Sequence, residues 1–173
     1  MKKVILLAGI LTLSTSLMAV SAKSSVEGVV DVKAKVVQPL ELETRALDYG
    51  IILPGEEKWG ETNGEVAITG TPGEQIKLEI KTSESGSYTT YKGPTVNYSV
   101  ELKTGNGSTE QEKMTAQVSL FTGGISGDDA ENGIFGLGTE GKVSFAVDGP
   151  LTAAQNQKPG EYTGKIYVRA MYN

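Results

Sequence analysis

The chain has 173 residues, with 16 basic and 21 acidic side chains and a net charge of −5. An acidic surface without a basic cluster repels phosphate backbones, so nucleic acid is not expected as a partner. The sequence has no cysteine and no histidine, which removes disulfides, the usual zinc ligands, the thiol nucleophile and the commonest general base. We therefore expect no enzymatic activity, no cofactor and no metal site.

The first 22 residues have the pattern of a cleaved signal peptide. Lys2 and Lys3 form a positive start, residues 4–13 form a short apolar run, and residues 20–22 supply small side chains for cleavage. The apolar run is too short for a comfortable membrane anchor, which is the alternative interpretation. The sequence thus predicts an exported chain of residues 23–173, which is a suitable length for one domain.

Residues 24–38 open this exported chain with a strict alternation. The apolar side chains of Val30, Val32, Ala34 and Val36 alternate with polar ones, as in a strand with one dry and one wet face. A strand at the start of a chain can pair with its own domain or with another molecule. We expect this strand to pair with another molecule.

The same period recurs through the rest of the chain. Residues 40–42 are expected to be extended, and a turn is predicted at 71–73 and another at 105–107. Residues 109–113 could form one helical turn, while 82–94 and 123–141 are expected to be loops. Strands are predicted at 46–53, 64–70, 76–81, 96–102, 114–120, 143–147 and 162–172. Strands separated by Gly, Pro and Asn turns, without a sustained helical period, predict an all-β antiparallel sandwich.

Several local motifs favour ordinary structural roles. The Gly136–Gly141 stretch matches G-x-G-x-x-G by letter, but a strand rather than a helix is expected after it, so it does not predict a phosphate cradle. The carboxylates of residues 128–132 fit no EF-hand spacing. Trp59, Tyr88 and Tyr91 are expected to anchor loops rather than to bind a sugar. Carboxylate pairs for glycoside chemistry are possible in principle, but nothing in the sequence locates one.

The two chain ends resemble those of a known family. Tyr172 is the penultimate residue, and Gly160 is fourteenth when Asn173 is counted as first. This pattern resembles fimbrial subunits of the chaperone–usher type. The opening run of residues 30–42 resembles the N-terminal extension of their alternate (alpha) class and of spore-coat-U-like relatives. The motifs at 47–50, 149–150 and 160–164 fall in the order of that family, whereas the Gly-rich loop 123–141 and the acidic balance depart from it.

The resemblance implies a structural role in a fimbria. The fold would be an incomplete immunoglobulin-like sandwich of residues 39–173, preceded by a donor-strand extension of residues 23–38. The residues inserted into a neighbouring subunit would be Val30, Val32, Ala34 and Val36. A partner or chaperone would contact an edge strand formed by Gly160, Tyr162, Gly164, Ile166, Val168, Ala170 and Tyr172.

The resemblance also implies the partners and the compartment. The partners would be identical or related pilin subunits, a periplasmic chaperone and an outer-membrane usher, in the periplasm and then at the surface of a Gram-negative bacterium. The receptor and the position in the fibre stay open. The alternative is a self-complete secreted sandwich that binds carbohydrate or a surface, in which residues 24–38 pair within their own molecule.

Overall fold

The computed structural model describes residues 27–93, 96–122 and 132–173, so the expected signal peptide lies outside the described residues. The chain divides into two compact units, Met1–Lys35 and Val36–Asn173. In the first unit, residues 27–35 have no regular secondary structure and all their side chains are exposed. Within the described residues, no helix is both long enough and apolar enough to span a membrane.

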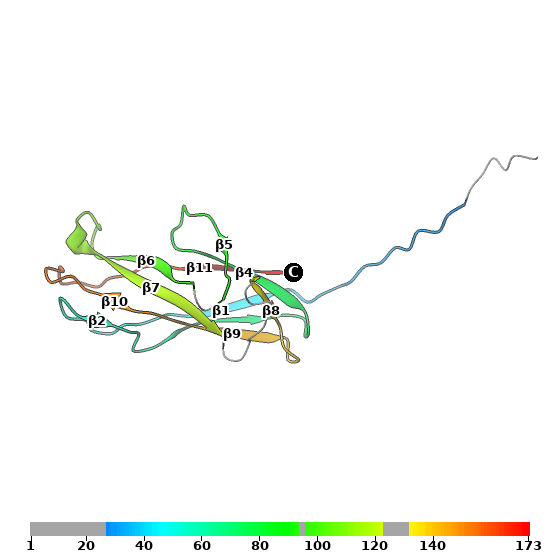
Figure 1. The fold of residues 1–173 in the computed structure, drawn as a ribbon, viewed down its shortest axis with the longest axis horizontal. Coiled ribbons are helices and arrows are strands. Elements are labelled where there is room, and N and C mark those ends of the chain that lie inside the picture. Colours follow the sequence, from blue (N-terminus) through cyan, green and yellow to red (C-terminus); the bar gives the residue numbers. More distant parts are fainter. Residues whose placement is uncertain (1–26, 94–95, 123–131) are drawn as a thin grey trace, which may run out of the picture. The chain divides into compact units, whose positions relative to one another are not determined.

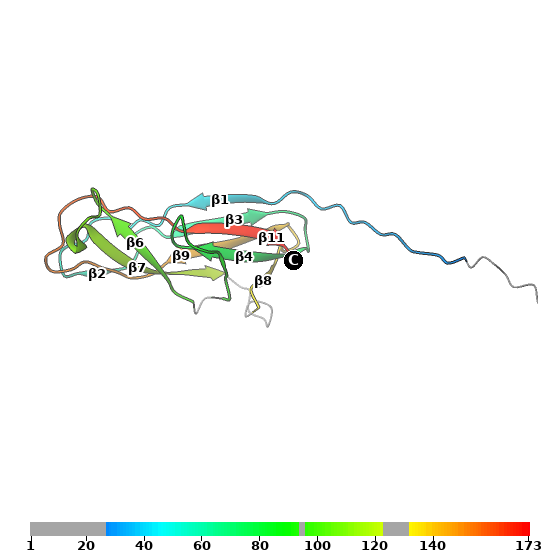
Figure 2. The ribbon, with the colours of Figure 1, turned by 90° about the horizontal axis from the view of Figure 1, so that it is seen from above.

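In its described residues, the second unit consists of antiparallel strands arranged in two sheets, with one 3₁₀ turn at Glu110–Glu112 (Figures 1 and 2). This confirms the predicted all-β sandwich. The strands are β1 Glu41–Arg45, β2 Glu57–Lys58, β3 Gly64–Thr69, β4 Gln75–Lys81, β5 Thr89–Thr90, β6 Tyr98–Lys103, β7 Lys113–Thr122, β8 Ile134–Gly136, β9 Lys142–Asp148, β10 Leu151–Thr152 and β11 Tyr167–Tyr172.

The larger sheet is organised around the long strand β7. Its strand order is β1-β3-β9-β7-β10-β2, and β6 also pairs with β7. Strands β9 and β10 are separated only by Gly149 and Pro150, and both pair with β7, through Val147 opposite Leu120 and Leu151 opposite Ala116. They therefore act as one bent strand along β7, and β1 forms an edge of this sheet.

The smaller sheet is organised around β4. Strands β5 and β8 pair with β4, and β11 pairs with it along its whole length, from Tyr167 opposite Lys81 to Tyr172 opposite Ile76. The alternation of residues 75–81 is realised as predicted, since Ile76, Leu78 and Ile80 are fully buried. Strand β11 is therefore an edge of the second sheet.

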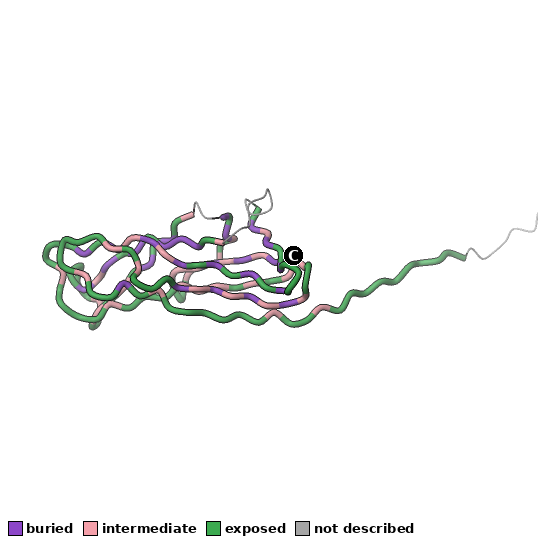
Figure 3. The backbone as a smooth tube through the Cα atoms, turned by 90° about the horizontal axis from the view of Figure 1, so that it is seen from below, coloured by how far each residue is buried: buried purple, intermediate pink, exposed green. Residues whose placement is uncertain are grey.

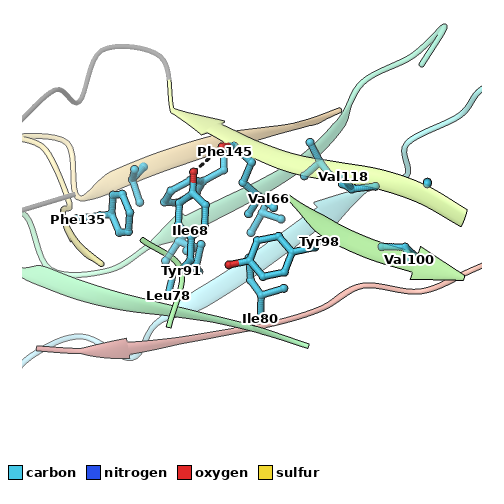
Figure 4. Packing of buried hydrophobic residues seen from close by; sticks show 14 of the residues in the cluster. Val66, Ile68, Leu78, Ile80, Tyr91, Tyr98, Val100, Val118, Phe135 and Phe145 are labelled. Carbon is cyan, nitrogen blue, oxygen red and sulfur yellow. Dashed lines mark hydrogen bonds between the residues drawn. The ribbon is translucent and has the colours of Figure 1, made fainter. Parts of the chain in front are cut away.

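The core lies between the two sheets, where strands such as β3, β4, β6 and β9 turn alternate side chains inward (Figure 3). Its centre is a group of aromatic rings from Tyr91, Phe135 and Phe145, with ring centroids 5.5 Å apart for Tyr91–Phe135 and 5.0 Å apart for Phe135–Phe145. The Tyr91 hydroxyl donates a hydrogen bond to the carbonyl of Leu120 (Figure 4). This bond satisfies the polar end of a buried ring.

Two of the loops expected from the sequence contain strands and core residues. The expectation for 123–141 is wrong over its described part, because 134–136 form β8 and Phe135 and Leu137 are fully buried. Residues 123–131, including most of the carboxylate cluster at 128–132, lie outside the described residues. The expected loop 82–94 contains β5, and Tyr91 packs in the core. Glycine-rich composition hid these segments, because their single large side chains show no period.

Two of the predicted strands are shorter or missing. Residues 46–53 form only an isolated bridge between Asp48 and Thr62, and Gly50 has a φ of 63°, which interrupts an extended backbone. The expected final strand 162–172 pairs regularly only from Tyr167, with an isolated bridge from Thr163 to Lys103. Residues 27–38 form no strand in the single chain, and pairing with another molecule stays a prediction.

Replacing Phe135 with alanine tests the reassignment of this stretch from loop to core. Removal of a fully buried ring that packs against two other rings should lower the free energy of unfolding by about 3–5 kcal/mol. Urea unfolding monitored by circular dichroism would measure this. Phe121→Ala is the matched control, because Phe121 is 39% exposed and should cost much less. Equal effects of the two substitutions would contradict the assignment.

Candidate functional site

The most distinctive feature of the second unit is a pair of strand edges without partners. Strand β1 pairs only with β3, and β11 pairs only with β4, within the described residues. The two strands run in opposite directions (Figure 2). Each free edge presents backbone N–H and C=O groups that can accept a further strand.

An apolar groove of about 1100 Å³ lies between the segments that contain these edges. One wall is formed by residues 44–52 and the other by residues 160–168. Both walls and the groove belong to the second unit. The floor comes from the larger sheet and consists of the apolar side chains of Val66, Val100, Leu102, Met114, Ala116, Val118, Val147 and Leu151.

The floor is covered in the free chain by side chains of the walls. Leu47 and Ile52 from one wall, and Ile166 and Val168 from the other, pack against the core, while the floor residue Val66 is only 2% exposed. No backbone hydrogen bond joins the two walls among the residues that the structure describes. The walls are therefore not joined to each other by backbone hydrogen bonds, and their apolar side chains rest on the core.

One end of the groove is closed by Tyr172. Its hydroxyl donates to the backbone carbonyl of Gln38 at 2.7 Å and accepts from the backbone N–H of Thr71 at 2.9 Å. The Gln38 N–H in turn donates to the Thr71 hydroxyl at 2.7 Å. These bonds fasten the end of β11 to the residues that lead into β1, so the two sheets cannot separate there without breaking them.

The opposite end is held by Tyr162 and a neighbouring loop. The Tyr162 hydroxyl lies 2.6 Å from the carbonyl oxygens of both Gln111 and Lys158, and it accepts a hydrogen bond from the Gln157 side chain at 2.8 Å. Thr163 then exchanges two backbone hydrogen bonds with Lys103. The second wall is thus anchored at its start, and its next regular pairing begins at Tyr167.

A carboxylate stabilises the loop behind this anchor. Glu112 accepts hydrogen bonds from the Lys158 ammonium and from the backbone N–H groups of Ser108 and Thr109. The bond to Lys158, followed by that to Ser108, lowers the pKa of the Glu112 carboxyl from its ordinary value of 4.5. The same contact raises the pKa of Lys158. The ion pair therefore helps to hold Lys158 and the adjoining segment in place.

Two buried tyrosine hydroxyls have no hydrogen-bond partner in the described structure, those of Tyr49 and Tyr98. Burial, with a contribution from the Asp148 carboxylate, raises the pKa of Tyr49 to about 12. Tyr49 lies in the first wall of the groove. Its protonated hydroxyl is available as a donor if a polar atom enters beside it.

The residues predicted to form an edge strand are divided between the groove and strand β11, and their contact with a partner stays a prediction. Gly160, Tyr162, Gly164, Ile166 and Val168 line the groove, whereas Ala170 and Tyr172 pack beyond its closed end. Because residue 164 is a glycine, the second wall can lie close to strand β6; a Cβ at this position would be only 2.8 Å from the carbonyl oxygen of Glu101. The four predicted insertion residues, Val30, Val32, Ala34 and Val36, are all exposed.

Sequence reasoning missed the first wall and the floor. Residues 46–53 have the composition of a strand, but this composition does not reveal that the segment pairs only through an isolated bridge at Asp48. The floor residues show only the inward period that every core strand shows. A signal for the groove exists only in the pairing between strands far apart in the sequence.

The other motifs do not form a site with this groove. Trp59 is 54% exposed. The Gly136–Gly141 stretch follows β8 and leads into strand β9 rather than a helix, and its Leu137 is fully buried. Among the described residues, no group of His, Cys, Asp or Glu could hold a metal ion.

The fold and the groove define a class of protein: an all-β antiparallel sandwich in which two edge strands face a common apolar groove. The chain belongs to the family described as "Domain of unknown function (DUF4402)", whose model matches residues 40–172. The match starts just before β1 and ends at the last residue of β11, so it covers the sandwich and leaves out the extension. Comparison with curated protein sequences finds no match.

Replacing Tyr172 with phenylalanine tests the bonds at the closed end. The ring packing is retained, but the Thr71 N–H and the Gln38 carbonyl lose their shared partner. We expect the free energy of unfolding to fall by about 1–2 kcal/mol. Equilibrium urea denaturation measures this, and Tyr167→Phe is the control, since the hydroxyl of Tyr167 makes no hydrogen bond among the described residues. Equal stability of Tyr172→Phe and the wild type would contradict the role of this hydroxyl.

Replacing Glu112 with glutamine tests the ion pair through its pH dependence. Because the folded-state pKa lies below 4.5, the contribution of the carboxylate is complete above that value and is lost as the pH falls through the folded-state pKa. Glu112→Gln should be less stable than the wild type near neutral pH, and the difference should shrink in acid. Glu110→Gln is the control in the same turn, with a side chain 91% exposed. A pH-independent difference between Glu112→Gln and the wild type would contradict this assignment.

Proposed function

We propose that this chain is a structural subunit of a surface fimbria, in which the N-terminal extension of one copy fills the groove of another. The observation that carries the proposal is the groove itself, with an unpaired strand edge on each side and an apolar floor. Addition of a strand would give both edges a backbone partner at once. It would also join the two sheets along this side of the sandwich.

The extension has the chemistry of such a strand. Val30, Val32 and Val36 are 83%, 91% and 95% exposed, which is unusual for a regular apolar alternation because exposed apolar surface favours burial. Burial of each valine side chain would contribute about 1.5–3 kcal/mol before entropic costs. Since whole domains are stable by about 5–15 kcal/mol, an inserted strand would add substantially to the stability of the subunit that receives it.

The closed end of the groove favours insertion into a second copy. To fill its own groove, the chain would have to reverse direction at residues 38–40. The N–H and C=O of Gln38 are both hydrogen-bonded there, and Pro39 has no N–H to offer a turn. The reversed segment would also run parallel to β11, whereas a segment from a second copy can run antiparallel to it, the slightly more stable pairing.

Insertion between copies would produce a chain of subunits. The extension ends at Gln38, whose carbonyl is bonded to Tyr172, and the residues before it would enter the groove of a neighbour. Because the donor surface and the groove are different parts of the molecule, the contact is head-to-tail and can repeat without closing. A periplasmic chaperone and an outer-membrane usher remain part of the proposal as the partners that would hold the groove before assembly.

The matched pair Val32→Asp and Val29→Asp tests this proposal. Both valines are more than 90% exposed, and they lie on opposite faces of the expected strand. A carboxylate at position 32 would enter the apolar groove, whereas one at position 29 would face solvent. Assembly is measured as a ladder on a gel that collapses to one band on boiling.

We expect Val32→Asp to reduce assembly by at least about tenfold and Val29→Asp to leave it nearly unchanged. Deletion of residues 23–36 should abolish the ladder. A ladder that persists after the deletion would show that the extension is not the donor. A stable monomer with no ladder from the intact chain would instead favour the self-complete binding domain.

A further inference from the structure

The rim of the groove carries an ordered set of charges. We define the rim as the four exposed charged side chains of the two walls, Arg45, Asp48, Glu161 and Lys165. The Arg45 guanidinium lies 3.3 Å from the Glu65 carboxylate, and Asp48 accepts a hydrogen bond from the N–H of Gly50. The side chains of Glu161 and Lys165 have no ion pair or hydrogen bond among the described residues.

Like charges of the rim lie level with each other across the groove. The walls are antiparallel and are joined at the contact between Gln38 and Tyr172. Arg45 lies seven residues after Gln38, and Lys165 lies seven residues before Tyr172, so these two side chains are level with each other. Asp48 lies ten residues after Gln38, and Glu161 lies eleven residues before Tyr172, so these two are nearly level. The rim therefore has a cationic level nearer the closed end and an anionic level farther from it.

Such an arrangement favours an inserted strand with the opposite order of charges. Like charges that face each other are unfavourable, and a counter-charge placed between them relieves both. The extension has this order when its apolar side chains face the groove. Its outward residues are then Asp31 followed by Lys33 and Lys35. The spacing of four residues from Asp31 to Lys35 matches that from Lys165 to Glu161.

We propose that the rim charges set the direction in which the extension of a second copy enters the groove. This inference rests on the proposed function. Asp31 lies between Arg45 and Lys165, and the two lysines lie toward Asp48 and Glu161. The inserted strand then runs antiparallel to β11, with its N-terminal end toward Tyr172.

The reverse direction is disfavoured by the same charges. It would bring Lys33 and Lys35 toward the cationic level and Asp31 toward Glu161. Each exposed pair contributes little by itself, but reversal changes several pairs from attraction to repulsion. The apolar face of the extension cannot make this choice, because a short run of valine and alanine presents similar side chains in both directions. The charges thus supply the directional preference.

A charge exchange within the full exported chain tests the proposal. Asp31→Lys combined with Lys35→Asp preserves composition and net charge while reversing the order of charges in the extension. We expect assembly to be slowed about tenfold at low salt and by less at high salt. Adding Glu161→Lys and Lys165→Glu to the same chain should restore part of the lost rate, because one of the two repulsive rim charges at each level then becomes attractive. Urea denaturation of each variant verifies that the sandwich remains folded.

The direction itself can be read by crosslinking, since the chain contains no cysteine. In the proposed direction, Val29 of one copy is level with Tyr167 of the next, and in the reverse direction, with Asp31 level with Glu161, Val29 lies within two residues of Glu161. The double variant Val29→Cys and Tyr167→Cys should therefore form a ladder that survives boiling without reductant. The double variant Val29→Cys and Glu161→Cys should form such a ladder at least about tenfold less efficiently.

The outcomes separate the two proposals. Normal assembly of the charge-exchanged extension, failure of the rim exchange to rescue it, or preferred crosslinking at position 161 would overturn the directional role of the charges while leaving insertion intact. A ladder unaffected by deletion of residues 23–36 would overturn the proposed function, and the directional role with it.

Discussion

The organisation of this protein depends on two strand edges that have no partner within the described structure. A sandwich normally completes its hydrogen bonding by pairing each strand on both sides or by leaving a short, protected edge. Here β1 and β11 each leave one side open, and one groove lies between the segment that continues from the end of β1 and the segment that leads into β11. Along residues 164–166 the backbone groups form no hydrogen bond with another backbone segment among the described residues, whereas along residues 49–52 the Gly50 N–H is bonded to Asp48 and the Ile51 carbonyl to Lys58.

The groove persists because its walls are fastened at their ends. Tyr172 bonds to Gln38 and Thr71 at the closed end, and Tyr162 bonds to the loop around Gln157 at the other. Between these anchors no backbone hydrogen bond joins the walls among the described residues, and their apolar side chains pack on the core. The two sheets are therefore fastened at the ends and not along the groove, which would suit the strand insertion that we propose.

The charges of the walls contribute differently from the apolar floor. Apolar burial supplies most of the favourable energy of strand addition, but it is nearly insensitive to strand direction. Exposed charges supply little energy and are sensitive to order. In the proposed insertion, Arg45, Asp48, Glu161 and Lys165 would select an orientation that the floor accepts but does not specify.

The sequence alone determined the fold class and most of the strands. Period-two alternation marked β3, β4, β6, β7 and β9, because a strand with one buried face must alternate, as Ile76, Leu78 and Ile80 do. It also marked the inward face of the final segment and the exposed alternation of residues 30–36. Only the tertiary structure revealed that Phe135 and Leu137 belong to the core, and that residues 46–53 form a wall rather than a paired strand. Strand pairing depends on contacts between distant segments, so a local pattern can identify a strand but cannot tell which of its edges remains open.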